Sequence, residues 1–92
     1  MKSIISDDKE DTCFWCGRWG SMHTHHIFGG PDRKVSDRYR LVVHLCIFCH
    51  DKVHGKDGDL MMETLHRIGQ EAYEEQIGSR EQFMSEFRRS YL

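Results

Sequence analysis

The feature that most constrains this chain is a pair of Cys-x-x-Cys sequences separated by 29 residues. Cys13 and Cys16 form the first pair, and Cys46 and Cys49 form the second. Each pair brings two thiolates close enough to bind one tetrahedral ion, and zinc favours a set of four sulfur ligands. A chain of only 92 residues buries a thin core. Because a structural zinc ion contributes on the order of 10 kcal/mol to folding, we predict a single small domain stabilised by zinc.

Three other uses of the cysteines stay open. Disulfides need an oxidising compartment, whereas the acidic start of the chain does not have the pattern of a secretory signal, and no apolar run is long enough for a membrane span. We therefore expect the protein in a reducing cytoplasm. A thioredoxin-like redox pair needs a βαβ pattern that neither pair has around it. The residues from Cys46 to His50 match the sequence for c-type haem attachment, but this use needs export and leaves the first pair unexplained.

Local patterns predict an α+β fold. We expect strands over 22–28 and 39–45, joined as a hairpin by a long basic loop that follows the turn sequence at 29–32. Helical spacing starts at Cys46 and stops at Gly55. The acidic residues 1–12 are expected to be a flexible tail.

Two further helices are predicted in the last third of the chain. The first begins at Gly58 or Asp59 and places its apolar residues on one face: Met61, Leu65, Ile68 and Ala72. The second follows a capping box in which Ser79 and Gln82 satisfy each other's backbone amides. The apolar faces of these two helices are most simply interpreted as core that covers the metal-bound part of the domain.

The net charge of −2 conceals a basic middle between acidic ends. Six basic residues lie in this middle part against two acidic ones: Arg33, Lys34, Arg38, Arg40, Lys52 and Lys56. Such a segment either presents a local positive face to nucleic acid or forms an ordinary mixed surface.

The histidines suggest a second metal site. His50 and His54 are four residues apart in the predicted helix, so they share one face. His25 and His26 are neighbours on the first strand and point to opposite sides. One of them can join the helical pair while the other stays free as a general base, and three imidazoles leave coordination positions open for chemistry. The alternative is that all four are zinc ligands or polar surface.

The remaining histidines have simpler interpretations. His23 shares a strand face with His25, which leaves the register of the ligand open. His44 is expected on the surface of the second strand, and His66 on the surface of a helix.

These sequences together resemble the HNH endonucleases that combine a ββα-metal core with a four-cysteine zinc site. The likeness is closest to small phage-encoded HNH proteins, which carry Phe-Gly-Gly-x-x-Arg-Lys-x-Ser after the histidines, here residues 28–36, and end in Tyr-Leu. It covers residues 13–92 as one nuclease domain, with the metal core over 13–57 and a helical extension over 58–92.

The resemblance implies a role for each histidine. His25, His50 and His54 would bind the catalytic ion, Mg²⁺ or Mn²⁺ with Zn²⁺ or Ni²⁺ as substitutes, and His26 would be the general base. The family's middle Asn is replaced by Leu41, so Asp37, Ser36 or Arg40 is expected to hold the loop and orient the base.

The expected activity is hydrolysis of DNA phosphodiester bonds in the cytoplasm of a bacterial host. Phosphate contacts are expected from four basic residues: Arg33, Lys34, Arg38 and Lys52. The likeness suggests phage packaging or recombination proteins as partners. The alternative is a non-catalytic zinc module that binds nucleic acid or protein.

Overall fold

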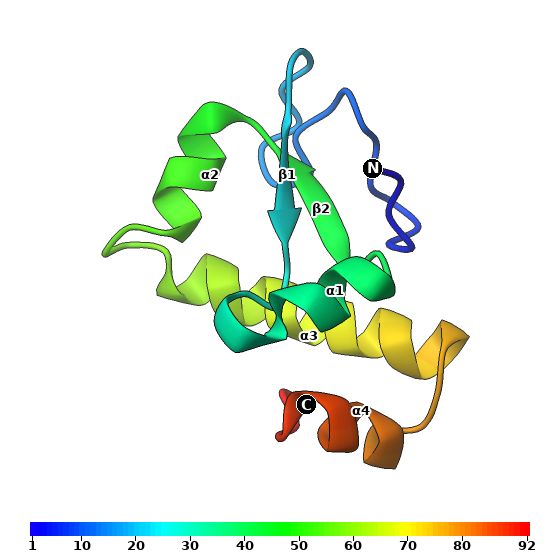
Figure 1. The fold of residues 1–92 in the computed structure, drawn as a ribbon. Coiled ribbons are helices and arrows are strands. Elements are labelled where there is room, and N and C mark those ends of the chain that lie inside the picture. The colour runs from blue at the N-terminus through cyan, green and yellow to red at the C-terminus, as the bar shows by residue number, and fades with distance from the viewer.

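A two-stranded antiparallel sheet stands at the centre of the computed structural model, which describes all residues 1–92 (Figure 1). Strand β1 spans His23–His26 and strand β2 spans Val42–Leu45. Their register pairs His25 with Val43 and His26 with Val42. The predicted hairpin is confirmed, although both strands are shorter than the sequence pattern indicated.

The connection between the strands is helical, where an open basic loop was predicted. A 3-10 turn, η1 (Gly30–Asp32), leads directly into helix α1 (Arg33–Arg38). The buried Ser36 hydroxyl donates a hydrogen bond to the Leu41 carbonyl at 2.7 Å and accepts one from the Phe28 amide at 3.3 Å. These tertiary contacts fix a short helix that its charged sequence does not reveal.

Three more helices complete an α+β fold. They are α2 (Ile47–Val53), α3 (Asp59–Gln76) and α4 (Arg80–Phe87). Helix α3 runs beneath the sheet, and α4 packs on the side of α3 away from the sheet (Figure 1). The predicted capping box starts α4: the Gln82 amide donates to the Ser79 hydroxyl at 3.2 Å, and the Ser79 amide donates to Gln82 Oε1 at 2.9 Å.

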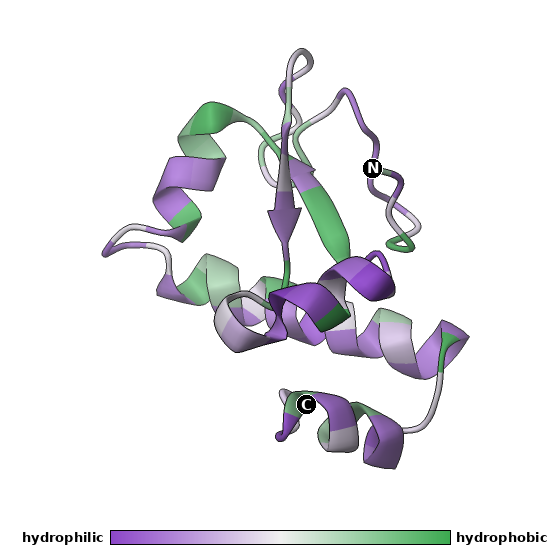
Figure 2. Ribbon diagram, in the orientation of Figure 1, coloured by the Kyte–Doolittle hydropathy of each residue, from purple (hydrophilic) through white to green (hydrophobic).

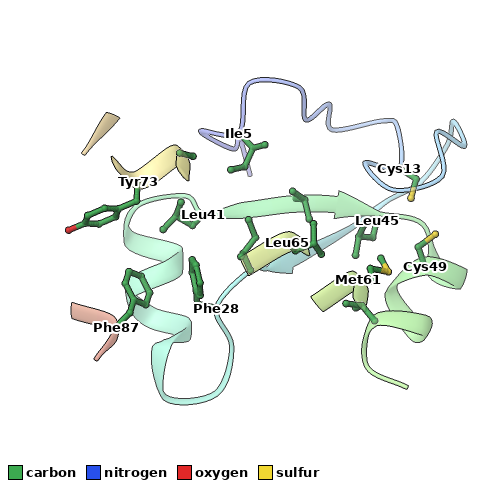
Figure 3. Close-up of a cluster of buried hydrophobic side chains, with 14 of the residues drawn as sticks. Ile5, Cys13, Phe28, Leu41, Leu45, Cys49, Met61, Leu65, Tyr73 and Phe87 are labelled. Atoms are coloured by element: carbon green, nitrogen blue, oxygen red, sulfur yellow. The ribbon is translucent and has the colours of Figure 1, made fainter. Parts of the chain in front are cut away.

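The hydrophobic core is one continuous cluster to which the sheet, α2, α3 and α4 all contribute side chains. Figure 3 shows Cys13 and Cys49 at one end of this cluster, and Tyr73 and Phe87 at the other. Leu65 lies between the two ends and is fully buried. The cysteines therefore close one end of the core.

Gly69 marks the closest approach of α3 to the chain that leaves β1. A Cβ atom at this position would lie 2.9 Å from both Ile27 Cγ2 and Phe28 Cε2. The absence of a side chain lets the helix pack directly under the residues that follow the histidines of β1.

The first twelve residues differ from the predicted flexible tail. They run beside β2, with Ile5 in the core and the Ile4 amide donating to the Arg40 carbonyl at 3.1 Å (Figure 1). The Asp8 carboxylate accepts hydrogen bonds from the His44 amide at 2.7 Å and from His44 Nδ1 at 2.6 Å. His44 is consequently buried, so its predicted place on the surface is wrong.

Hydropathy follows this arrangement. Strand β2 is buried at every residue and is largely hydrophobic, whereas α1 is mostly hydrophilic (Figure 2).

None of the helices is both long enough and apolar enough to cross a membrane.

Candidate metal centres

The structure brings the four predicted cysteines into one cluster. Their sulfur atoms all lie within 4.8 Å of one another, and Cys16 Sγ is 3.7 Å from Cys46 Sγ. All four are free thiols, and only Cys16 is exposed. Four sulfurs this close together can hold a zinc ion, which four-cysteine sites bind in tetrahedral geometry.

Local backbone geometry positions each pair. Gly17 has a φ of 80° and closes the first turn by donating its amide to the Cys13 carbonyl at 2.9 Å. The second pair lies at the start of α2, where Cys46 is the N-cap. The Phe14 amide donates to the His44 carbonyl at 2.8 Å and so ties the turn to β2.

The electrostatics of the cluster favour a bound cation. Burial alone would raise the pKa of the Cys13 thiol, but the backbone N–H groups of Cys16, Cys46 and Trp15 bring it down to about 6. Burial and contacts with the other thiols raise the pKa of Cys49. The Cys13 thiolate therefore forms readily, whereas a nearby positive charge would be needed for Cys49 to lose its proton.

Three histidines form a second cluster. His25 comes from β1, His50 from α2 and His54 from the C-cap of that helix, and one ring nitrogen of each lies within 4.8 Å of the other two. The ring centroid of His25 is 5.4 Å from that of His50 and 5.3 Å from that of His54. The structure thus juxtaposes the three residues predicted as ligands.

His25 Nε2 is the one buried side-chain nitrogen or oxygen atom that has no hydrogen-bond partner. Leaving such an atom unpaired costs about 1–3 kcal/mol. A divalent cation would satisfy it, and imidazole nitrogens suit several divalent metals. The residues present therefore fit a bound metal ion.

Burial also favours the neutral form of two of these imidazoles, those of His25 and His50. It lowers the pKa of His25 to about 4, with a further contribution from the nearby His50 and His54. Burial likewise lowers the pKa of His50. Neutral imidazoles retain the lone pair that a metal ligand needs.

His26 lies outside the three-histidine cluster and contacts a carboxylate. Its Nε2 lies 2.9 Å from Asp37 Oδ1 in α1, and the side chain is 15% exposed. Of the three residues predicted to orient His26, Asp37 is the one that contacts it. Ser36 instead bonds the Leu41 carbonyl.

A polar hollow of about 230 Å³ adjoins both His25 and His26. It is lined by His25, His26, Gly29, Gly30, Arg33 and His54. Arg33 is thus the one basic residue, among the four predicted to contact phosphate, that lines this hollow. Lys34 and Lys52 are exposed elsewhere, and Arg38 lies 3.7 Å from Glu86.

Two further histidines contact residues of the site or of the core. His23 Nδ1 lies 2.9 Å from His50 Nδ1, so His23 contacts a predicted ligand. His66, predicted on a helix surface, is half-buried and stacks on Phe28 with 5.3 Å between ring centroids. The only sequence signal for the position of His23 near the cluster is that alternate residues of a strand share a face, which places His23 on the same face as His25.

Comparison of the chain with protein-family models, curated proteins and solved structures finds no match.

Proposed function

We propose that the protein is a metal-dependent endonuclease of the HNH type that hydrolyses phosphodiester bonds in DNA. The observation that carries the proposal is the unpartnered, buried His25 Nε2 in a cluster with His50 and His54. A second histidine, held by a carboxylate, lies next to it in sequence and borders the same hollow. In this proposal β1, β2 and α2 form the ββα-metal core.

The two clusters would hold different ions. Zn²⁺ in the cysteine cluster would have a structural role, because four protein ligands leave no position open. His25, His50 and His54 would hold Mg²⁺ or Mn²⁺, and Zn²⁺ or Ni²⁺ would also suit three imidazoles. The ion supplies Lewis acidity at the scissile phosphate when it is bound.

His26 is proposed as the general base. Its Nε2–H donates to Asp37, so Nδ1 keeps a lone pair that can accept a proton from an attacking water. The water oxygen forms a bond to phosphorus as the bond to the 3′ oxygen breaks. The departing oxygen takes a proton from solvent, which leaves 5′-phosphate and 3′-hydroxyl ends.

Arg33 is the proposed contact to the phosphate, because it lines the hollow together with His25 and His26. Lys34, Arg38 and Lys52 are proposed as contacts further along the DNA backbone. Such contacts position the substrate without reading its sequence. The resemblance to phage proteins further suggests packaging or recombination proteins as partners in the cytoplasm of a bacterial host.

A non-catalytic zinc module is the second candidate. Trp19 is 78% exposed and Phe48 is 64% exposed, and both lie on the segments that carry the cysteines. Arg18 covers the Phe48 ring, with its guanidinium carbon 4.7 Å from the ring centroid. Exposed aromatic side chains of this kind bind nucleobases or protein partners.

Nicking of supercoiled plasmid DNA in the presence of Mg²⁺ or Mn²⁺ tests the proposal. We expect the wild-type protein to nick, and the His26→Ala variant to nick about 10²–10⁴-fold more slowly because it lacks the base. Thr24→Ala is the matched control on the same strand and should nick like the wild type.

Two results would contradict the endonuclease. Equal rates for the wild type and His26→Ala would remove the assigned base. DNA binding without cleavage under any divalent ion, with one zinc ion per chain, would favour the zinc module instead.

A further inference from the structure

His23 lies beside the three-histidine cluster without belonging to it. Its Nδ1 is 2.9 Å from His50 Nδ1, and the two rings are nearly perpendicular, with an interplanar angle of 80°. The nitrogens that form the cluster are those of His25, His50 and His54. The His23 side chain is exposed, unlike that of His25 on the same face of β1.

A hydrogen bond between two neutral imidazoles needs a proton on one nitrogen and a lone pair on the other. If His50 Nδ1 accepted, its proton would sit on Nε2, and neither nitrogen would be available to an ion. If His50 Nδ1 donates to His23, Nε2 carries the lone pair. Only the second arrangement keeps the contact with His23 and also leaves His50 a lone pair for an ion.

We propose that His23 is a positioning residue that fixes His50 in the tautomer protonated at Nδ1, so that Nε2 is presented to the metal. This inference rests on the proposed metal site of the endonuclease. Ligating histidines generally donate their other ring N–H to an acceptor, and that partner orients the ring and raises its basicity. Here the acceptor is a second imidazole from the neighbouring strand.

The contact with His23 distinguishes His50 from His54. His50 is partly buried and its Nδ1 contacts His23, whereas His54 is exposed at the C-cap of α2. Fixing the ring of His50 reduces the rotamer freedom that metal binding would otherwise remove.

The experiment measures the binding of a second Zn²⁺ ion to protein whose cysteine cluster already holds one. Calorimetry gives the affinity, and the ¹⁵N chemical shifts of the imidazoles show which nitrogens are protonated and which bind zinc. The variants are His23→Leu, which removes the acceptor, and His23→Asn, whose amide oxygen replaces Nδ1 as the acceptor. Thr24→Ala, on the opposite face of β1, is the matched control.

We expect wild-type His50 to bind through Nε2 with a proton on Nδ1. His23→Leu should weaken binding of the second ion by about 10- to 100-fold, and His23→Asn should recover most of that loss. Because the side chain is exposed, the variants should fold like the wild type, which thermal unfolding checks.

Unchanged affinity in His23→Leu would overturn the inference, and so would a ¹⁵N shift showing zinc bound to His23 itself. Either result, with DNA cleavage by the wild type intact, would leave the endonuclease standing. Failure of the wild type to bind any second ion would overturn the metal site and the inference together.

Discussion

Asp37 and His26, eleven residues apart, are joined by a hydrogen bond of 2.9 Å between Oδ1 of the carboxylate and Nε2 of the imidazole. The bond links α1 to β1, so the helix between the strands holds a side chain beside the hollow. A carboxylate in this position fixes the tautomer and the orientation of the imidazole.

If the protein is the proposed endonuclease, removing the Asp37 carboxylate should slow DNA cleavage while leaving metal binding at His25, His50 and His54 intact. We expect Asp37→Ala to nick DNA more slowly than the wild type, because His26 can then rotate and change tautomer. The loss of rate should be smaller than the roughly 10²–10⁴-fold loss expected when the base itself is removed. Plasmid nicking measures the rate, and Glu75→Gln, an exposed acid on α3, is the control. Cleavage at the wild-type rate by Asp37→Ala would show that His26 needs no orienting carboxylate.

Removal of zinc should unfold the protein. The cysteines close one end of the core, and a structural zinc ion contributes on the order of 10 kcal/mol, comparable with the roughly 5–15 kcal/mol stability of a whole domain. Circular dichroism during titration with a chelator should show loss of helix, with four thiols becoming reactive. The control variant His50→Ala should still fold when zinc is bound to the cysteines, because His50 belongs to the separate histidine cluster. A chelated protein that keeps its helices would contradict a structural role for the ion.

Asp8→Ala should destabilise the fold, although its position was predicted to be in a flexible tail. The side chain is 1% exposed and carries both hydrogen bonds to His44. Loss of a buried charged acceptor leaves the His44 donors unpaired, and we expect a decrease of about 3 kcal/mol in the free energy of unfolding. Urea unfolding measures it, with the exposed Asp7→Ala as control. Equal midpoints for the two variants would mean that the segment is not held on β2.

The stability of the protein should fall at alkaline pH through Tyr73. Burial raises the pKa of Tyr73, and its hydroxyl donates to Glu86 Oε2 at 2.6 Å. Above a pH of about 10 the unfolded chain loses the phenolic proton while the folded protein keeps it. The free energy of unfolding therefore decreases by up to about 1.4 kcal/mol per pH unit, and is unaffected by this group below that pH.

Tyr73→Phe tests this assignment, because it removes the titrating group and leaves Glu86 bonded to the Tyr39 hydroxyl at 2.6 Å. Urea unfolding at neutral pH and at about pH 11 should show a smaller alkaline loss in the variant than in the wild type. An identical loss in both proteins would assign the effect to other groups.

Residue spacing determined a large part of this structure. The Cys-x-x-Cys pairs, the two separate strands, the start of α3 near Asp59 and the capping box at Ser79 each follow from a pattern within a few residues. Local hydrogen bonding and side-chain periodicity act between residues that are a few positions apart, so they can be predicted from the sequence.

Only the tertiary structure decided which polar side chains meet. The contacts of Asp37 with His26, Asp8 with His44 and His23 with His50 join residues 11, 36 and 27 positions apart. No local pattern selects such partners, because the pairing depends on how α1, α2 and the first residues pack around the two strands. A buried polar atom must find a partner wherever the folded chain supplies one, and packing, not spacing, fixes that place.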